Sequence, residues 1–597
     1  RYNRLMGRDS FFLTGTDEHG QKVDEAAREL DRTPIEHCDI TVLRFKELWE
    51  KLEITNDHFI RTTEKGHIEV VQEILQDLMD RELIYKGAYE GWYCVPCERF
   101  FTEKDLVDEK CPECQREVKK IEEPNYFFKM GQYQDWLIEY IQTHPGFVQP
   151  ESRSNEVLGF LKKGPLGDLC ISRPKERLAW GIELPFDPDY VCYVWFDALL
   201  NYITGIGYRR DESAFLKWWP ATYNLIGKDI LTTHAVYWPI MLKAMGIDPP
   251  QTVFAHGWWL TRDSKMSKSR GNIVNPMDMI DAYGVDSFRY FLIAEMKLGK
   301  DCNFTEEGFV GKYNAELAND LGNLLSRVVT MIRKNCDGII PAPGEPGVKE
   351  AALEAAAADT VAFAEDAVLS LNLDRMTARI FELVRLVNKY FDENAPWKML
   401  KEGDRPGLER VLYHASEALR IIAGLLQPVM PAKMEALRCT LGLAAGVPDI
   451  ALLRKWGSLE PGAALGEITQ LFPRIETSPA EAAAAEEKEE DRMSHKDFQK
   501  IDLKTARVIA CEKVPKSDKL LKLEIDLGSE QRTIVAGIAQ QYKPDDMIGR
   551  TIIVVANLEK AKLFGIESNG MLLAAHGEEG LRLLTTDEET SPGASVS

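Results

Sequence analysis

The stretch SFFLTGTDEHGQK, residues 10–22, indicates the architecture of the first part of the chain. Its apolar half has the pattern of a buried strand, and helical periodicity follows over residues 24–52. Alternation of this kind over residues 1–85 predicts a parallel α/β sheet. Ligands bind at the carboxyl ends of strands in such sheets, and Asp17, Glu18 and His19 follow this strand directly. Taken alone, however, helix capping explains these polar residues more simply than ligand binding does.

Other patterns divide the rest of the chain. Strand-like segments return in YVCYVWFDALLNY (190–202), YNLIGKDI (223–230) and TVFAHGWWL (252–260). Long amphipathic helices then dominate, and the last stretch has short alternating segments typical of a small β-barrel. We therefore expect a multidomain α/β plus all-α plus all-β protein with these segments: 1–85, first part of the α/β domain; 86–173, an insertion; 174–285, its second half; 286–475, a helical bundle; 476–494, a charged linker; and 495–597, the barrel.

Composition narrows the class of protein. A chain of 597 residues is too long for one hydrophobic core, and no apolar run approaches the roughly 20 residues of a membrane helix. We expect no signal peptide and no membrane partner. The net charge of −22 argues against long-range attraction to nucleic acid but leaves local basic sites open. Eleven cysteines, an odd number, suit a reducing cytoplasm better than a disulfide framework.

Four of the cysteines form two close pairs. Cys94 and Cys97 are separated by two residues, as are Cys111 and Cys114, and thirteen residues lie between the pairs. This spacing predicts one tetrahedral zinc ion held by four thiolates. Because such a site leaves no open position for water, we expect a structural metal, with RNA binding by the knuckle left open.

The loop SKMSKSRGN, residues 264–272, places cationic groups in an acidic chain. Lys265 and Lys268 flank Met266 and Ser267, so two ammonium groups can approach a polyphosphate together. Gly271 allows the loop to close as charge develops on the phosphates. A solvated basic loop is the alternative interpretation.

KMSKS is the signature of class I aminoacyl-tRNA synthetases, and this chain resembles the methionyl-tRNA synthetase family in particular. The resemblance rests on FFLTGTDEHGQK, the cysteine knuckle, YVWFDALLNY and LIGKDILTTHAVYWPIML, and it covers nearly the whole chain. It implies a Rossmann-type nucleotide-binding core with a zinc-knuckle insertion, a helical anticodon-binding bundle and a C-terminal OB-fold barrel. The implied activity joins L-methionine to tRNA(Met), using ATP with Mg²⁺.

The resemblance also implies roles for matching residues. For ATP these residues are Gly227, Asp229, His256, Gly257, Lys265 and Lys268, with the two lysines acting in catalysis on the phosphates. For methionine they are Asp17, Arg173, Trp195, Ala198, Tyr202, Ile230 and His234. Asp17 would contact the ammonium group, and the aromatic residues suit a thioether, because sulfur packs favourably against ring edges. Leu199 and Thr233 differ from other branches of the family and leave the detailed shape of the pocket open.

Two further sites carry implied contacts with tRNA. Asn323, Arg327 and Trp397 match the family's anticodon readers, in which Asn and Arg bond base edges and Trp stacks on a base. In the barrel, Lys560 and Lys562 suit phosphate contact, and Ser568 lies in a matching loop. Barrels of this type often dimerise, so a homodimer is a possible assembly.

The start of the chain departs from the family. RYNRLMGRDS, residues 1–10, resembles sequence that follows the family's HIGH-type motif, so we expect that motif to be missing. Two functions are then open: a methionine–tRNA ligase, or a catalytically disabled tRNA-binding protein. The intact KMSKS and GKD motifs favour the ligase. Other class I enzymes fit less well, because residues 85–173 are too few for a large editing insertion and a four-thiolate knuckle differs from an open catalytic zinc.

Overall fold

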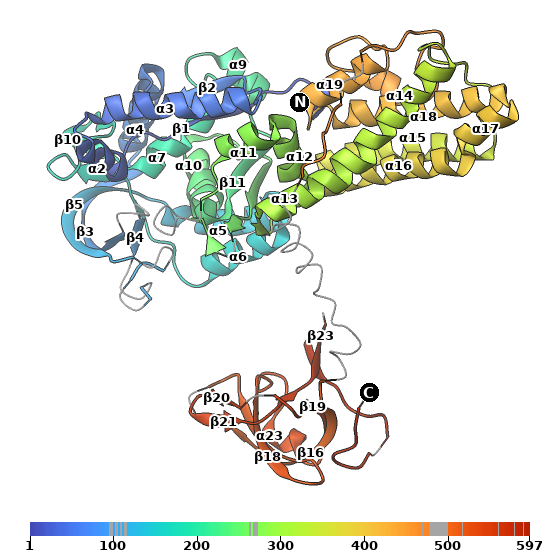
Figure 1. Cartoon of the computed structure of the whole chain (residues 1–597). Helices are drawn as coiled ribbons and strands as arrows, with labels where there is room; N and C mark the ends of the chain where they lie inside the picture. The colour runs from blue at the N-terminus through green and yellow to red at the C-terminus, as the bar shows by residue number, and fades with distance from the viewer. Residues whose placement is uncertain are drawn as a thin grey trace. The chain divides into compact units, whose positions relative to one another are not determined.

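The computed structural model describes residues 1–94, 99–101, 106–107, 110–112, 116–261, 264–266, 273–467, 470–476, 500–515, 517–558, 560–577, 580–588 and 590–596. The chain forms two compact units, Arg1–Ile475 and Glu476–Ser597, and each is described by itself (Figure 1). Within the described ranges, no helix combines the length and the apolar character that crossing a bilayer requires.

The first unit opens with strands and helices in alternation, as the sequence predicts. These elements are α1 (Tyr2–Leu5), β1 (Leu13–Thr16), α2 (Gln21–Glu29), α3 (Pro34–Lys51), β2 (His58–Arg61) and α4 (Lys65–Asp80). α3 begins sharply because Thr33 and Glu36 form a capping box and Pro34 occupies the first turn. β1 and β2 are parallel, with Thr16 opposite Arg61 at their carboxyl ends.

An antiparallel sheet and several short helices follow. They comprise β3 (Ile84–Cys94), β4 (Arg99–Phe101), β5 (Lys119–Phe128), α5 (Gln134–Thr143), β6 (Val148–Gln149), α6 (Glu151–Lys162), β7 (Leu169–Cys170), β8 (Ser172–Pro174), β9 (Glu183–Leu184) and β10 (Asp187–Cys192). Four of these strands form one sheet in the order β4-β3-β5-β7. β3 and β5, with 11 and 10 residues, are the longest strands of this part of the chain.

The α/β pattern then resumes. Its elements are α7 (Val194–Leu199), α8 (Asn201–Thr204), α9 (Glu212–Trp218), β11 (Tyr223–Gly227), a 3₁₀ turn (Lys228–Ile230), a π-helical turn (Thr233–Tyr237), α10 (Trp238–Met245), β12 (Thr252–His256), β13 (Trp259–Thr261), β14 (Ser264–Lys265), α11 (Pro276–Tyr283), α12 (Val285–Glu295) and β15 (Cys302–Asn303). β11, β12 and β6 form a parallel sheet in that order. The expected strand over residues 190–202 is wrong beyond Cys192, because residues 194–204 wind into α7 and α8.

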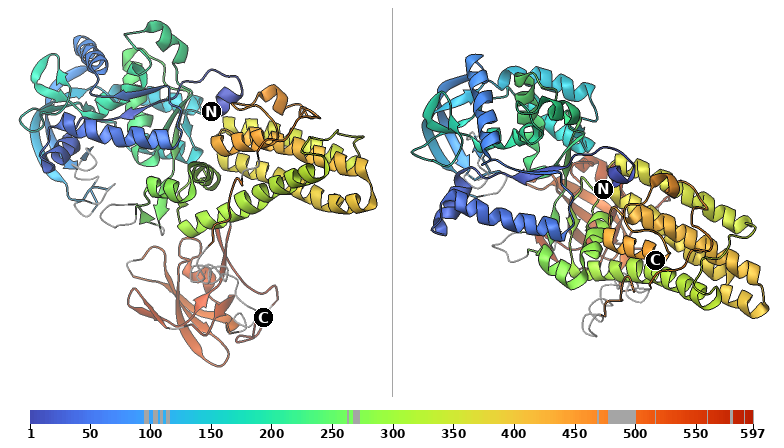
Figure 2. Two further views of the ribbon diagram at one scale, coloured as in Figure 1. Left: turned by 45° about the horizontal axis from the view of Figure 1, so that its top comes forward. Right: turned by 90° about the horizontal axis from the view of Figure 1, so that it is seen from above.

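Residues 306–453 form the expected helical bundle. It contains α13 (Glu306–Lys312), a π-helical stretch (Tyr313–Gly322), α14 (Asn323–Asn335), α15 (Val348–Leu369), α16 (Leu373–Asn394), α17 (Pro396–Glu402), α18 (Arg405–Leu426), α19 (Pro431–Thr440) and α20 (Ile450–Leu453). α18 contacts α14, α15, α16, α17, α19 and α20 and is buried along most of its length, so it forms the centre of the bundle (Figure 2). Within α18, the buried Glu417 accepts hydrogen bonds from Arg420.

One arginine ties the α/β part to this bundle. Arg289 on α12 donates to the carbonyl oxygen of Leu52, at the end of α3, over 2.7 Å. The same guanidinium donates to the carbonyl oxygens of Pro428 (2.9 Å) and Val429 (2.8 Å), between α18 and α19. Three main-chain acceptors from two distant parts of the sequence therefore meet on one side chain.

Among its described residues, the second unit is all-β apart from one helical turn, as expected. Its elements are β16 (Leu503–Lys513), β17 (Leu521–Asp526), β18 (Gln531–Ala536), α23 (Pro544–Met547), β19 (Thr551–Val555), β20 (Ala561–Leu563), β21 (Ile566–Ser568), β22 (Met571–Leu572), β23 (Ala574–Gly577) and β24 (Gly580–Leu583). The main sheet has the order β18-β17-β16-β19-β22. Because β22 also contacts β18, the sheet nearly closes into a barrel.

Candidate active site and nucleic-acid interfaces

Three consecutive polar residues in the loop after β1, Asp17, Glu18 and His19, have different surroundings. Glu18 is buried, and its carboxylate accepts from Arg61 Nε at 2.7 Å, Thr16 Oγ1 at 2.8 Å and Thr63 Oγ1 at 2.5 Å. His19 is also buried, with its ring 5.1 Å from that of Trp180. Both side chains are thus fully engaged inside the protein, which leaves Asp17 as the loop's candidate ligand-binding group.

Asp17 carries a carboxylate that no cationic side chain neutralises among the described residues. Asn201 on α8 donates to its Oδ1 at 3.1 Å. Although the side chain is accessible to solvent, burial by the surrounding protein and the nearby Asp197 charge raise the pKa of Asp17 to about 6. The protein therefore presents an accessible negative charge that an incoming ammonium group would stabilise.

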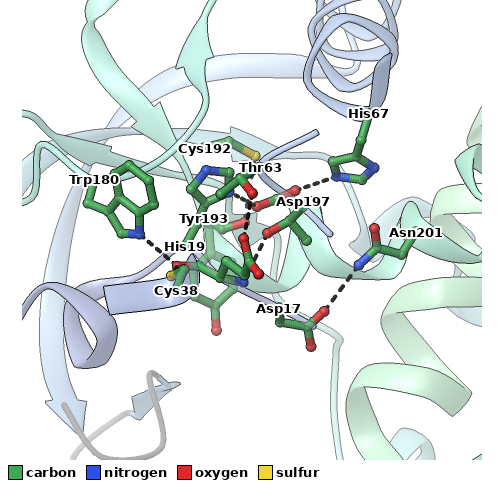
Figure 3. Close-up of polar contacts among 12 residues, drawn as sticks. Asp17, His19, Cys38, Thr63, His67, Trp180, Cys192, Tyr193, Asp197 and Asn201 are labelled. Carbon is green, nitrogen blue, oxygen red and sulfur yellow. Dashed lines mark hydrogen bonds and ion pairs between the residues drawn. The ribbon is translucent and has the colours of Figure 1, made fainter. Parts of the chain in front are cut away.

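Behind this loop lies a buried network that the sequence did not reveal. Asp197 on α7 lies between two imidazoles, with Oδ2 2.7 Å from His19 Nδ1 and Oδ1 2.7 Å from His67 Nε2 (Figure 3). His67 Nδ1 is 2.8 Å from Thr204 Oγ1. Although burial opposes its charge, the two histidine contacts hold the pKa of Asp197 below its ordinary value. No local motif marks His67 and Asp197, because they are 130 residues apart in the sequence.

The predicted methionine pocket residues form an aromatic cluster. The Tyr202 hydroxyl lies 2.9 Å from His234 Nε2, and His234 Nδ1 lies 3.0 Å from the Ile230 carbonyl oxygen. The carbonyl only accepts, so Nδ1 carries the proton and Tyr202 donates to Nε2. Burial lowers the pKa of His234 to about 4, which keeps its ring neutral. The Trp195 ring stands edge-on to His234 at 6.3 Å, and the buried Ala198 lies on the same helix as Trp195.

Two of the predicted ATP residues face each other across parallel strands. Gly227 ends β11 directly opposite His256, which ends β12. Asp229 follows on the 3₁₀ turn, and its Oδ1 accepts from Trp258 Nε1 at 3.3 Å. A side chain at position 257 would meet the backbone carbonyl oxygen of Lys300 at 2.0 Å, so the packing of the protein itself requires glycine there.

Three predicted cationic site residues remain: Arg173, Lys265 and Lys268. Arg173, on β8, is buried, and its guanidinium lies over the rings of Tyr93 (5.1 Å) and Tyr193 (4.6 Å). The backbone of Lys265 pairs with Leu260 in the β13–β14 ribbon, whereas Lys268 lies outside the described residues. A phosphate role for the two lysines therefore remains a prediction.

Half of the predicted zinc ligands belong to the described part of the chain. Cys94, at the end of β3, and Cys111 are both fully buried and belong to one small cluster with Trp92, Leu106 and Val118. Cys97 and Cys114 lie outside the described residues. Four-thiolate coordination of zinc remains a prediction.

The bundle brings two of the three predicted anticodon residues together. Arg327 on α14 pairs with Asp392 on α16, and its guanidinium lies 5.9 Å from the centre of the Trp397 ring. Trp397 is 41% exposed, an unusual state for the largest apolar side chain. Asn323, four residues before Arg327, is exposed at the start of α14. An open aromatic face thus lies beside a cationic group.

The barrel presents its predicted residues on one hairpin. Lys560 and Lys562 are exposed, and Lys560 Nζ is 2.7 Å from Glu567. Ser568 is buried instead, where its hydroxyl accepts from the Val535 amide at 3.0 Å and donates to the Gly570 carbonyl at 3.2 Å. Its observed contacts support the hairpin from inside.

Comparisons with known proteins agree with this arrangement. Residues 1–123 and 116–329 match the family model of tRNA synthetases class I (M). Residues 340–488 match the anticodon binding domain of methionyl tRNA ligase, and residues 503–595 match a putative tRNA binding domain.

Individual relatives are similar along nearly their full length. The chain is 45% identical to methionine–tRNA ligase of Thermotoga maritima, covering 100% of this chain and 95% of that protein. For methionine–tRNA ligase of Bacillus subtilis the identity is 40%, with coverages of 100% and 94%. A crystal structure of Mycobacterium tuberculosis methionyl-tRNA synthetase bound by methionyl-adenylate superposes with a TM-score of 0.76 at 40% identity, covering 79% of this chain and 94% of that one.

These coverages lend no support to the expectation that the chain lacks the family's first motif. With a family model matched over residues 1–329 and relatives at 40–45% identity over its whole length, the chain belongs to the methionyl-tRNA synthetase family, the methionine–tRNA ligases of class I.

Proposed function

We propose that the chain activates L-methionine with MgATP to methionyl-adenylate and then transfers the methionyl group to the 3′ end of tRNA(Met). In the first step a methionine carboxylate oxygen attacks the α-phosphorus and pyrophosphate leaves. In the second, a ribose hydroxyl of the terminal nucleotide attacks the carbonyl carbon and AMP leaves. The observation that carries the proposal is the accessible, un-neutralised Asp17 carboxylate beside a neutral aromatic pocket.

The two ends of the proposed methionine site are set by consecutive residues of α8. Asn201 holds Asp17, and Tyr202 holds His234. The Asp17 charge also acts on Tyr202, because burial and this carboxylate together raise the pKa of the Tyr202 hydroxyl. Asp17 would bind the ammonium group while the rings enclose the thioether.

Several remaining residues complete the pocket. The side chain of the substrate methionine would be enclosed by Trp195, Ala198, Tyr202, Ile230 and His234. The buried indole Nε1 of Trp195 has no hydrogen-bond partner among the described residues, and such a donor favours an incoming acceptor. Arg173 would contribute positive charge from behind its aromatic neighbours to the polar end of the adenylate.

ATP would bind at the paired strand ends. Asp229 would accept from ribose hydroxyls, while Gly227, His256 and Gly257 would lie beside the adenine. The carboxyl ends of the parallel strands β11 and β12 meet at one edge, which supports this placement. Lys265 and Lys268 would stabilise the phosphates as negative charge develops on pyrophosphate.

We propose that the bundle reads the anticodon through Asn323, Arg327 and Trp397. The exposed ring of Trp397 offers a stacking face for an unpaired base, and Asn323 and Arg327 offer donors to base edges. In the barrel, which we assign to the OB fold, Lys560 and Lys562 would bind phosphates, and Ser568 would order their hairpin. Exposed Phe564 and Leu563 on that hairpin make a homodimer through this barrel reasonable.

A structural zinc ion fits the cysteine cluster. Cys94 and Cys111 are buried thiols in one cluster, as two ligands of a closed site would be. With Cys97 and Cys114 they would supply four thiolates, and the metal would cross-link the insertion without taking part in the reaction. The expected compartment of the protein is the cytoplasm, because eleven cysteines, an odd number, suit a reducing environment better than a disulfide framework. We also propose, for the whole chain, the domain boundaries that the sequence predicts.

Methionine-dependent exchange between ATP and pyrophosphate tests activation, and charging of tRNA(Met) tests transfer. We expect both reactions to require methionine and to be reduced at least about 100-fold by Asp17→Ala, because the ammonium group loses the counter-charge that Asp17 supplies. Exchange that proceeds equally with leucine, or charging unaffected by Asp17→Ala, would contradict the proposal.

A further inference from the structure

We propose that Asp197 is a positioning residue for methionine binding, which holds the Asp17 loop against the helices that carry Trp195 and Tyr202. Asp197 makes this connection through His19 on one side and His67 on the other. The inference rests on the proposed function and adds to it a residue that does not touch the substrate.

The hydrogen bonds to Asp197 have one consistent assignment of donor and acceptor. A carboxylate only accepts, so His19 Nδ1 and His67 Nε2 both donate to Asp197. His67, if neutral, then accepts at Nδ1 from Thr204 Oγ1. The chain of bonds runs from α8 through α4 and α7 to the loop after β1, and so joins four segments that are separate in the sequence. Figure 3 shows Asp197 with His19 and His67.

The network determines where Asp17 points. Glu18 and His19 are fixed on the protein side, Glu18 by Arg61 and Thr63, and His19 by Asp197. Because the next two residues, Glu18 and His19, are fixed in this way, the Asp17 side chain points to Asn201. The negative charge of Asp197 reaches Asp17 as well, since it contributes to the raised pKa of that carboxyl.

The same residue also fixes the opposite wall of the pocket. Asp197 lies between Trp195 and Ala198 in the six residues of α7, so its two bonds restrain the helix that presents them. Thr204 restrains α8 just after Asn201 and Tyr202. A buried ion is weak evidence for stability, because well-packed apolar residues often stabilise a fold as well. The buried charge of Asp197 is better explained by a role in holding the Asp17 loop and the helices α7 and α8 in fixed positions relative to one another.

A double-mutant cycle tests the proposal on the full chain, with methionine binding measured by titration calorimetry. We expect Asp197→Asn to weaken methionine binding about 10-fold or more, and MgATP binding less than about 2-fold. In an Asp17→Ala background the same change should weaken methionine binding by a clearly smaller factor, because the part of the effect that Asp197 exerts through Asp17 is already lost. His67→Gln, which can still donate to Asp197, should bind methionine more tightly than His67→Ala.

A matched control removes a buried carboxylate far from the site. Glu417→Gln in α18 should lower the melting temperature while leaving methionine binding unchanged. Equal losses of methionine binding from Asp197→Asn in both backgrounds, or a parallel loss of MgATP binding, would show a merely structural role. If Asp197→Asn does not fold, His67→Ala in the same two backgrounds decides by the same criterion. Failure of the unaltered chain to bind methionine would contradict the proposed function itself.

Discussion

The side-chain amide of Asn201 lies 3.1 Å from the carboxylate of Asp17 and gives it a hydrogen bond without a positive charge. A salt bridge in that position would already have neutralised Asp17, and a substrate ammonium would then have to displace it. The amide orients the carboxylate and leaves its charge for the ligand. This relationship makes the protonation state of Asp17 central to substrate binding.

Methionine binding should therefore weaken in mild acid. The pKa of Asp17 is raised to about 6, so below pH 6 the carboxyl takes up a proton and loses its attraction for ammonium. His234 stays neutral over this range because its pKa is about 4. We expect binding at pH 5 to be about 10-fold weaker than at pH 7. Calorimetric titration should show this change in the unaltered chain, with much less of it in Asp17→Asn.

The stability of the first unit should also depend on pH through His234. Its folded-state pKa of about 4 lies below the ordinary 6.5, so the unfolded chain takes up a proton first as pH falls. Stability from this group is complete above pH 6.5 and is lost progressively toward pH 4, by about 2–3 kcal/mol in total. Urea unfolding at pH 7 and pH 4.5 should show a smaller difference for His234→Gln. Equal differences in both proteins would contradict the prediction.

Trp397→Ala should weaken tRNA binding while leaving methionine activation intact. An aromatic stacking contact contributes about 1–3 kcal/mol per base, so charging should become about 5- to 150-fold less efficient at low tRNA. Phe363→Ala on α15 is the matched control, since Phe363 is 40% exposed, close to the 41% of Trp397. Equal effects of the two substitutions on charging would argue against a specific anticodon contact.

Cys94→Ser and Cys111→Ser should each lose about one zinc ion per chain, because a four-thiolate site needs all its ligands. The control is Cys336→Ser, which removes a buried thiol at the end of α14. Elemental analysis of the purified proteins gives the metal content directly. Full zinc content in Cys94→Ser would refute the assignment of this ligand.

Removing charge from the barrel hairpin should change the salt dependence of tRNA binding. Lys562→Gln should lower the slope of log affinity against log salt by about 0.7–0.9, the value for one phosphate contact. Lys522→Gln on β17 is the control, because Lys522 already pairs with Glu512 at 2.9 Å. A slope unchanged by Lys562→Gln would remove this lysine from the interface.

The sequence predicted those parts of the fold and site that local pattern specifies. The apolar pattern of the segments 223–230 and 252–260 predicts strands, and the structure pairs them in parallel so that Gly227 lies opposite His256, two residues that the family resemblance alone singles out. Local pattern failed at residues 194–204, where an apolar, aromatic run with strand-like composition is helical. Short apolar runs suit either element, and tertiary contacts decided between them.

Long-range pairing explains the other differences. Glu18, His19 and Asp17 are equivalent polar residues in the sequence, and only their partners, Arg61 and Asp197 among them, separate the two internal groups from the accessible one. Ser568 shows the same effect, since its burial depends on β18. Such partners leave no periodic signal near the residue that they fix.

The joint made by Arg289 has a consequence for how this protein tolerates sequence change. Its acceptors are the main-chain carbonyls of Leu52, Pro428 and Val429, which every amino acid possesses. Substitution at those three positions therefore removes none of the acceptor atoms, whereas any residue other than arginine at 289 loses the planar set of donors. For these three hydrogen bonds, mutational sensitivity is therefore concentrated on codon 289, whereas Leu52 and Val429 are constrained through their packing against and within the hydrophobic core.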